Sequence, residues 1–169
     1  DNLERLDGVT HDALIEWMNI AYNRYLDTLQ ITVPDLKTIK NAGGKLVHYH
    51  GESVPAGSSI YYFDNGRTLY PQQIYNQSVD ALADWYRLFL IPRAAQCGTN
   101  SLQPGPWPAS LIDTLFEWFE GGSALDRLNS TVADRSELAG ETQQPCKWPI
   151  RPVWDGNEND SVYDYASID

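Results

Sequence analysis

The sequence has little positive charge and no long apolar run. Twelve Lys and Arg residues stand against 23 Asp and Glu residues in a chain of 169, which gives a formal net charge of −11. Binding to nucleic acid or to an anionic membrane surface needs clustered cations, so this balance argues against both classes of partner. No segment approaches the roughly 20 apolar residues of a membrane-spanning helix. Residues 1–9 are polar and acidic, unlike a signal peptide, so we expect the chain to begin as a mature product or inside a longer precursor.

Cysteine is also sparse, because only Cys97 and Cys146 occur. Two cysteines allow one internal bridge or two bridges to other chains. A nucleophilic Cys97 would need a nearby imidazole, which the local sequence does not supply, so a disulfide is the favoured interpretation. Glycosylation sequons begin at Asn76, Asn129 and Asn159. Together they favour a secreted glycoprotein, in which both thiols are expected to be oxidised.

Two kinds of catalytic centre find little support. No Gly-x-Ser-x-Gly motif is present, and the nearest approach, Gly57-Ser58-Ser59, is more typical of a helix start. His48 and His50 alternate on a predicted strand and therefore point to one face. Catalytic zinc takes three protein ligands, and a third is not evident. We predict no metal and no other cofactor, and we assign both histidines to packing and hydrogen bonding at the strand end.

The predicted elements follow the order helix, strand, helix, strand, helix. After a helix cap at Thr10, apolar residues recur at helical spacing as far as Leu29, and we expect that face to be core. Strands are predicted over 45–50 and 86–91, and the second is apolar enough to be buried on both faces. The remaining helices are predicted near 58–63, from a cap at Ser78 to Trp85, and from Pro108 through Phe119, where Gly121-Gly122 ends the apolar stripe.

This order is typical of βαβ units and predicts an α/β fold with parallel strands flanked by helices. We assign residues 1–128 to that core and residues 129–169 to an extended Pro- and Trp-rich tail that packs on it as a strap. Two strands are too few for an independently stable sheet. We therefore expect further strands from another segment or another chain.

Several stretches resemble the C-terminal part of fungal tannases, in the tannase and feruloyl esterase family. The resemblance runs from about residue 9 to the end; its clearest stretches are Gly43-Gly44-Lys45-Leu46, His48-Tyr49-His50-Gly51-Glu52-Ser53, Tyr70-Pro71-Gln72-Gln73, Tyr86-Arg87-Leu88-Phe89-Leu90 and Trp148-Pro149-Ile150-Arg151-Pro152. It implies an α/β-hydrolase fold that cleaves phenolic-acid esters, such as gallate or ferulate esters, with a Ser-His-Asp triad.

The resemblance also implies a partner. The family's serine lies in an N-terminal segment, and the cysteine matched by Cys97 forms a disulfide with that segment. A family partner for Cys146 would fall near Ser161, so Cys146 is expected to be free or paired differently.

Two triad positions depart from the family pattern. The family aspartate of His-Gly-x-x-Asp is matched by Val54, and the histidine of Pro-Gly-x-x-His-Cys is matched by Gln96, with Arg93 at the glycine. Valine cannot orient an imidazole, and glutamine cannot act as a base near neutral pH. We therefore expect a pseudoenzyme, catalytically inactive alone. Tyr49 and Trp107 are candidates to line a site for a phenolic ring, although such aromatics more often serve packing.

Two alternatives stay open at this point. The chain could be an active serine esterase completed by an N-terminal segment that supplies the missing groups. It could also be a secreted, non-catalytic binding or structural protein that keeps only the fold.

Overall fold

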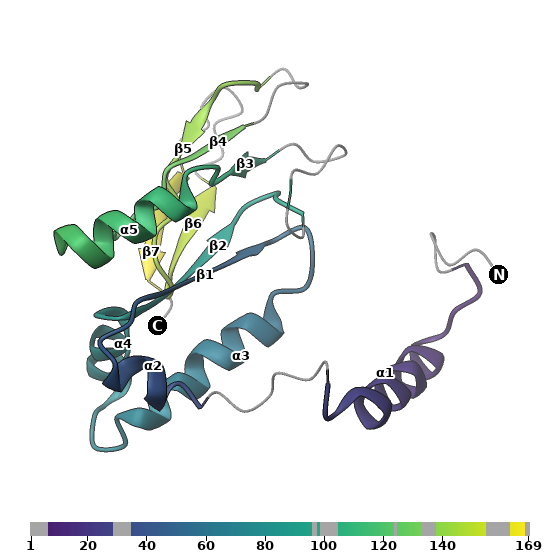
Figure 1. Ribbon diagram of the computed structural model, residues 1–169. Coiled ribbons are helices and arrows are strands. Elements are labelled where there is room, and N and C mark those ends of the chain that lie inside the picture. Colours follow the sequence, from purple (N-terminus) through teal and green to yellow (C-terminus); the bar gives the residue numbers. More distant parts are fainter. Residues whose placement is uncertain are drawn as a thin grey trace. The chain divides into compact units, whose positions relative to one another are not determined.

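The computed structural model describes residues 7–28, 35–95, 98, 105–123, 125–132, 138–154 and 163–167. Its contacts divide the chain into two units, Asp1–Val33 and Pro34–Asp169. The first unit contains helix α1 (His11–Tyr25). All other helices and strands belong to the second unit, which carries the sheet and the candidate site (Figure 1). Within these ranges, no helix has both the length and the apolar character needed to cross a bilayer.

Helix α1 begins as predicted but does not bury its apolar face. The Thr10 hydroxyl oxygen accepts a hydrogen bond from the Ala13 backbone N–H at 3.2 Å, which confirms the predicted cap. None of the α1 side chains is buried, and Met18 is 72% exposed. The prediction that this face is core was therefore wrong for this structure. Helical periodicity shows that a helix has an apolar side, but it does not identify the segment that covers it.

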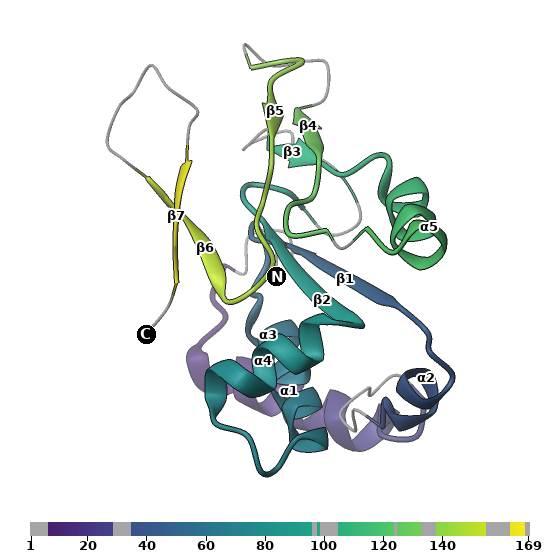
Figure 2. The same ribbon diagram turned by 90° about the vertical axis from the view of Figure 1, so that its left-hand side faces the viewer.

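A pair of parallel strands forms the centre of the second unit. Strand β1 (Leu46–Gly51) pairs with β2 (Tyr86–Ile91), from Leu46 opposite Tyr86 to Gly51 opposite Ile91. Every residue of β2 is buried, as its apolar composition predicted. Both strands and their parallel pairing are confirmed, and the two run side by side in both ribbon views (Figures 1 and 2).

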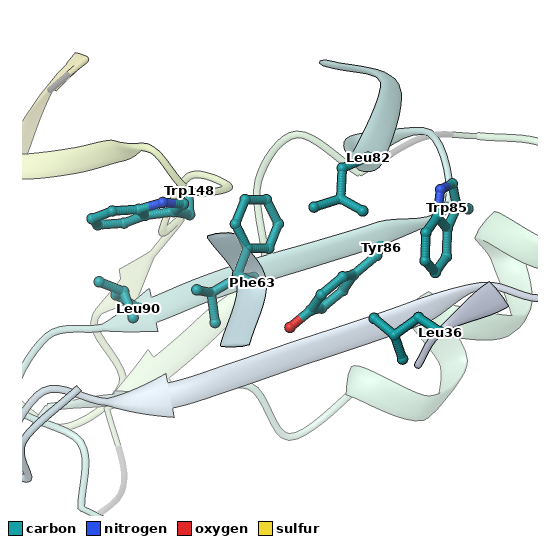
Figure 3. Close-up of a cluster of buried hydrophobic side chains, with 8 residues drawn as sticks. Leu36, Phe63, Leu82, Trp85, Tyr86, Leu90 and Trp148 are labelled. Carbon is teal, nitrogen blue, oxygen red and sulfur yellow. The ribbon is translucent and has the colours of Figure 1, made fainter. Parts of the chain in front are cut away.

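Helices cover one face of this pair and build the larger core. Helix α3 (Gly57–Gly66) continues into a 3-10 turn (Arg67–Leu69), and α4 (Tyr75–Ala83) leads directly into β2. The short helix α2 (Lys37–Asn41) precedes β1. The buried residues of this core come from α3, α4 and β2, from the residues flanking α2 and α4, and from the C-terminal tail: Leu36, Phe63, Leu82, Trp85, Tyr86, Leu88, Leu90 and Trp148 (Figure 3).

Helix α5 (Leu111–Gly121) packs on the opposite face. Two cations contact the ring of its buried Trp118: the Arg87 guanidinium lies 4.8 Å and the Lys45 ammonium 5.0 Å from the ring centroid. A second, smaller core forms here from Phe89, Ile91, Ala94 and Leu128. The helix ends where the sequence predicted, because Gly122 takes the left-handed conformation with φ 67°.

Helix α4 differs from its prediction at the N-terminus. It begins at Tyr75, so Ser78 lies inside the helix and does not cap it. The Ser78 hydroxyl donates to the Tyr75 carbonyl at 2.7 Å and accepts from Arg67 Nε at 2.9 Å. Serine is a common cap, but its hydroxyl can also bond back to the preceding turn, and here it does.

The remaining strands are antiparallel, and none of them was predicted. Strands β3 (Pro106–Trp107), β4 (Ser130–Val132) and β5 (Thr142–Gln143) form one small sheet, and β6 (Ile150–Trp154) pairs with β7 (Tyr163–Ser167). Between these sheets the chain lies against the edge of β2. There Lys147 forms a bridge with Phe89, and the Trp148 N–H donates to the Leu88 carbonyl at 2.7 Å.

Candidate functional site

The loops that follow β1 and β2 are joined at the carboxyl end of the parallel pair. The Glu52 N–H donates to the Ile91 carbonyl at 2.9 Å, and the Ser53 N–H donates to the Ala94 carbonyl at 3.0 Å. Gly51 makes this approach possible, because a Cβ there would lie closer than 3.0 Å to the backbone oxygens of Ala94 and Ala95. In α/β sheets the carboxyl ends of the strands are where ligands bind. This edge is therefore the first place to look for a site.

One face of β1 carries both histidines, as the alternation predicted. Nδ1 of His48 lies 2.9 Å from the Tyr86 hydroxyl, and the two rings are stacked. Burial lowers the pKa of His48, and the neighbouring His50 lowers it further. Burial likewise raises the pKa of Tyr86, with a smaller contribution from Tyr62. Both groups are therefore neutral near pH 7, and they share one hydrogen bond whose direction is set by the tautomer of the imidazole.

His50 pairs with a serine that the sequence did not connect to it. Its Nδ1 lies 2.9 Å from Oγ of Ser59, a buried residue in the first turn of α3. Its Nε2 is buried and has no hydrogen-bond partner among the described residues. Serine and imidazole at this distance are the first two members of a nucleophile and base arrangement. The third member, a carboxylate that orients the imidazole, is missing from the described surroundings of Nε2.

The other face of β1 carries Tyr49, which lies against the second predicted aromatic residue, Trp107 of β3. The rings of Tyr49 and Trp107 meet edge to face, with centroids 5.4 Å apart. Both are half-buried and pack against the smaller core around Phe89. The structure thus brings together two residues that are 58 positions apart (107 − 49). The buried part of each ring packs against this core, and the rest of each ring is exposed and could contact a ligand.

No group of three His, Cys, Asp or Glu side chains that could hold a metal ion occurs within the described ranges. His48 and His50 are directed at Tyr86 and Ser59, and each has its Nδ1 engaged. The chemistry that these residues offer is hydrogen bonding and, at Ser59, an acyl-transfer geometry without its orienting acid.

Comparison with known proteins agrees with this architecture. The family profile described as "Tannase and feruloyl esterase" matches residues 1–168. A tannase of Aspergillus oryzae is 49% identical over 174 aligned positions, which cover 100% of this chain and 29% of that protein. The chain belongs to the tannase and feruloyl esterase family.

Other relatives agree with this assignment. Feruloyl esterase C of Talaromyces stipitatus is 25% identical over 157 positions, covering 83% of this chain and 28% of that protein. The structure of tannin acyl hydrolase from Aspergillus niger superposes with a TM-score of 0.78 and 41% identity, covering 96% of this chain and 30% of that one. The chain thus spans less than a third of the length of these tannase-family relatives.

Val54, which the tannase resemblance predicts at the position of the triad aspartate, lies in the joined loops. It is half-buried, and its N–H donates to the Gly51 carbonyl at 3.2 Å, which closes a tight turn after β1. The neighbouring carboxylate of Glu52 forms an ion pair with Arg151 at 2.7 Å. Glu52 is therefore committed to the C-terminal tail. Gln96, which the resemblance predicts at the position of the triad histidine, lies outside the described residues.

The loop after β2 contains a residue in the left-handed conformation. Arg93, which the tannase resemblance predicts at the position of a family glycine, adopts φ 59°. This conformation costs a residue with a Cβ about 1–2 kcal/mol. A glycine would adopt it without that cost.

The remaining predicted positions lie away from these loops or outside the described residues. Cys146 is buried and free, and burial is the main cause that raises the pKa of its thiol, so it is an inert packing residue. Cys97 and Asn159 lie outside the described residues. Asn76 and Asn129 are exposed, and Asn129 Oδ1 accepts from Gln144 Nε2 at 2.7 Å.

Proposed function

We propose that this chain is the carboxyl-edge portion of a secreted tannase-like fold that binds phenolic-acid esters without hydrolysing them by itself. The observation that carries the proposal is Val54 in the joined loops. Backbone hydrogen bonds hold the loop that the resemblance matches to the triad aspartate against the loop after β2, and the Val54 side chain in that loop carries no charge.

Loss of turnover follows from what each triad member does. The base must accept a proton from the serine, and the acid must hold the imidazole in the right tautomer. An amide at Gln96 and an alkyl group at Val54 do neither. In triad hydrolases, removing members of the triad costs on the order of a million-fold in turnover. Hydrolysis of methyl gallate, followed by chromatography, tests the proposal, and turnover at rates typical of enzymes by this chain alone would overturn it.

Ligand binding is proposed for the aromatic pair. Aromatic side chains that meet edge to face offer a ring face and an apolar wall to a phenolic ring. Titration of methyl gallate against tryptophan fluorescence should show saturable quenching that Tyr49→Ala weakens at least tenfold. Tyr61→Ala is the matched control, because Tyr61 is 65% exposed on α3, a helix of the larger core, whereas Tyr49 and Trp107 pack against the smaller one. Equal loss in both variants would refute the assignment.

The pair of Ser59 and His50 supports a second candidate function, an active serine esterase. In that case Ser59 Oγ attacks a fluorophosphonate probe at phosphorus, its proton passes to His50, and fluoride leaves. Intact-mass measurement should then show one adduct, absent in Ser59→Ala and retained in Ser58→Ala. The adjacent Ser58 is exposed and makes a matched control. The first proposal expects no adduct in any of the three proteins.

We propose the same partner and location that the tannase resemblance implies. The partner is an N-terminal segment of the same hydrolase, linked by a disulfide through Cys97, and the assembly is extracellular and glycosylated at one or more of Asn76, Asn129 and Asn159. Mass spectrometry of protein secreted by a eukaryotic host, before and after reduction and deglycosylation, tests each part separately. An unmodified, reduced Cys97 in the secreted protein would contradict the disulfide.

A further inference from the structure

Arg93 is an exposed cation at the carboxyl edge of the parallel pair. It lies two positions after the end of β2. Arg87 and Arg151 each form an ion pair, with Asp126 and Glu52, but Arg93 forms no ion pair or side-chain hydrogen bond with any residue that the structure describes. A guanidinium carries five N–H donors and no acceptor. The donors of Arg93 are therefore available to an anion.

Backbone contacts place Arg93 beside the aromatic pair. A Cβ at Gly105, two residues before Trp107, would lie 2.6 Å from the Cβ of Arg93. The next residue, Ala94, packs in the smaller core against which Tyr49 and Trp107 lie. In extended chain, residues two positions apart are separated by about 7 Å and lie on the same side. The long Arg93 side chain therefore starts within reach of the exposed parts of the two rings.

The backbone at Arg93 is strained, which indicates a role for its side chain. No other residue with a Cβ has a positive φ within the described ranges. Glycine adopts this conformation freely, and arginine does not. Gly105 lacks the Cβ that would overlap with Arg93, so the next segment leaves room for the arginine. Residues strained in this way gather at binding and catalytic sites.

We propose that Arg93 determines specificity at this edge and makes the site prefer free phenolic acids to their esters. The proposal rests on the ligand site proposed above at Tyr49 and Trp107. The carboxylate of a free acid is charged at pH 7 and can accept two parallel N–H bonds from one guanidinium. An ester carries no charge, and hydrogen bonds to neutral acceptors are about half as strong. The ligand class is an aromatic carboxylate, the acid that hydrolysis of a phenolic ester releases.

The charge of the whole chain makes a cation in direct contact important. The net charge of −11 does not attract an anion to the protein as a whole. At physiological ionic strength, exposed charges more than about 8 Å apart are largely screened from each other. Arg93 should therefore act by contact with the carboxylate. A positive charge removed from a distant surface position should leave the preference unchanged.

The test is isothermal titration calorimetry at pH 7 with the full 169-residue chain, with gallate and methyl gallate as the two probes. We expect wild type to bind gallate about tenfold more tightly than methyl gallate. Arg93→Gly should bind the two probes equally, because it loses affinity for gallate alone. Arg93→Lys keeps the charge without the planar fork and should retain part of the preference. Lys37→Gln, at an exposed residue of α2, is the matched control for charge and should retain all of it.

The possible outcomes separate this inference from the proposed function. If wild type binds both probes equally, or if Arg93→Gly keeps the preference, Arg93 does not determine specificity, although the ligand site survives. If Lys37→Gln loses the preference as well, net charge is its cause and the inference is overturned. If wild type binds neither probe, the proposed ligand site falls and this inference with it. Urea melts check folding: Arg93→Gly relieves strain and should be at least as stable as wild type, so its loss of gallate binding would not come from unfolding.

Discussion

Gly51 is the position where adding one methyl group should lower the stability of the fold most. Replacing it with alanine places a Cβ against the carbonyl oxygens of Ala94 and Ala95, at distances that real Cβ contacts do not reach. The loop after β2 must retreat, and the hydrogen bond from the Ser53 N–H to the Ala94 carbonyl is then lost. Overpacking costs about 1–3 kcal/mol and the bond about 1 kcal/mol, against a gain below about 1 kcal/mol from stiffening the unfolded chain.

We therefore expect Gly51→Ala to lower the free energy of unfolding by about 2–3 kcal/mol. Urea denaturation followed by tryptophan fluorescence measures it as a lower midpoint at unchanged slope. Gly57→Ala is the control, because a Cβ at that first residue of α3 meets nothing within 4 Å. It should be neutral or stabilise by up to about 1 kcal/mol. If the two variants are equally stable, the close contact between the loops does not exist as described.

Three further predictions concern other parts of the second unit. Arg93→Gly should raise the free energy of unfolding by about 0.5–1 kcal/mol in urea melts, because it removes left-handed strain, whereas Arg93→Ala should not. The pKa of His48 is lowered in the folded chain, so as the pH falls below 6.5 the unfolded chain protonates His48 before the folded chain does. The free energy of unfolding should therefore decline below pH 6.5 by at most about 1.4 kcal/mol per pH unit, and by less in His48→Phe. A pH-independent wild type would refute this. Cys146 should react with a thiol reagent only at the rate of unfolding, since it is buried with a raised pKa; immediate labelling of this thiol in Cys97→Ser would contradict its burial.

The sequence predicted the parallel pair well, because β2 is apolar except for Arg87 and the two histidines of β1 alternate with other residues. These patterns determine which side of each strand is buried. They placed both histidines on one face and correctly indicated burial of β2 on both sides. The close of α5 at Gly122 followed from the same kind of local rule. Local chemistry was sufficient wherever an element was long enough to show its period.

Prediction failed where a strand is too short to show a period and where a contact joins two different elements. Strands β3 and β5 have two residues each, which is too short for any period. The Ser59–His50 pair joins a strand to the next helix, and the only sequence signal was a serine near a helix start, which has a common structural explanation. The exposed face of α1 shows another limit. Its periodicity correctly predicted a helix with an apolar side, but periodicity does not identify the segment that covers that side.

Under the proposed function, the joined loops also explain why the acid and the base of the triad would be lost together. A carboxylate at the half-buried Val54 position would need a cationic or hydrogen-bonding partner, and without one its desolvation would destabilise the loop. The family histidine supplies that partner, and an amide at position 96 does not offer a positive charge. Once the base is gone, an apolar residue fits the turn after β1 better than an acid. Under the proposed function, Val54 is therefore the substitution that keeps this edge stable after turnover is lost, while Gly51 and the left-handed turn at Arg93 preserve the shape of the edge.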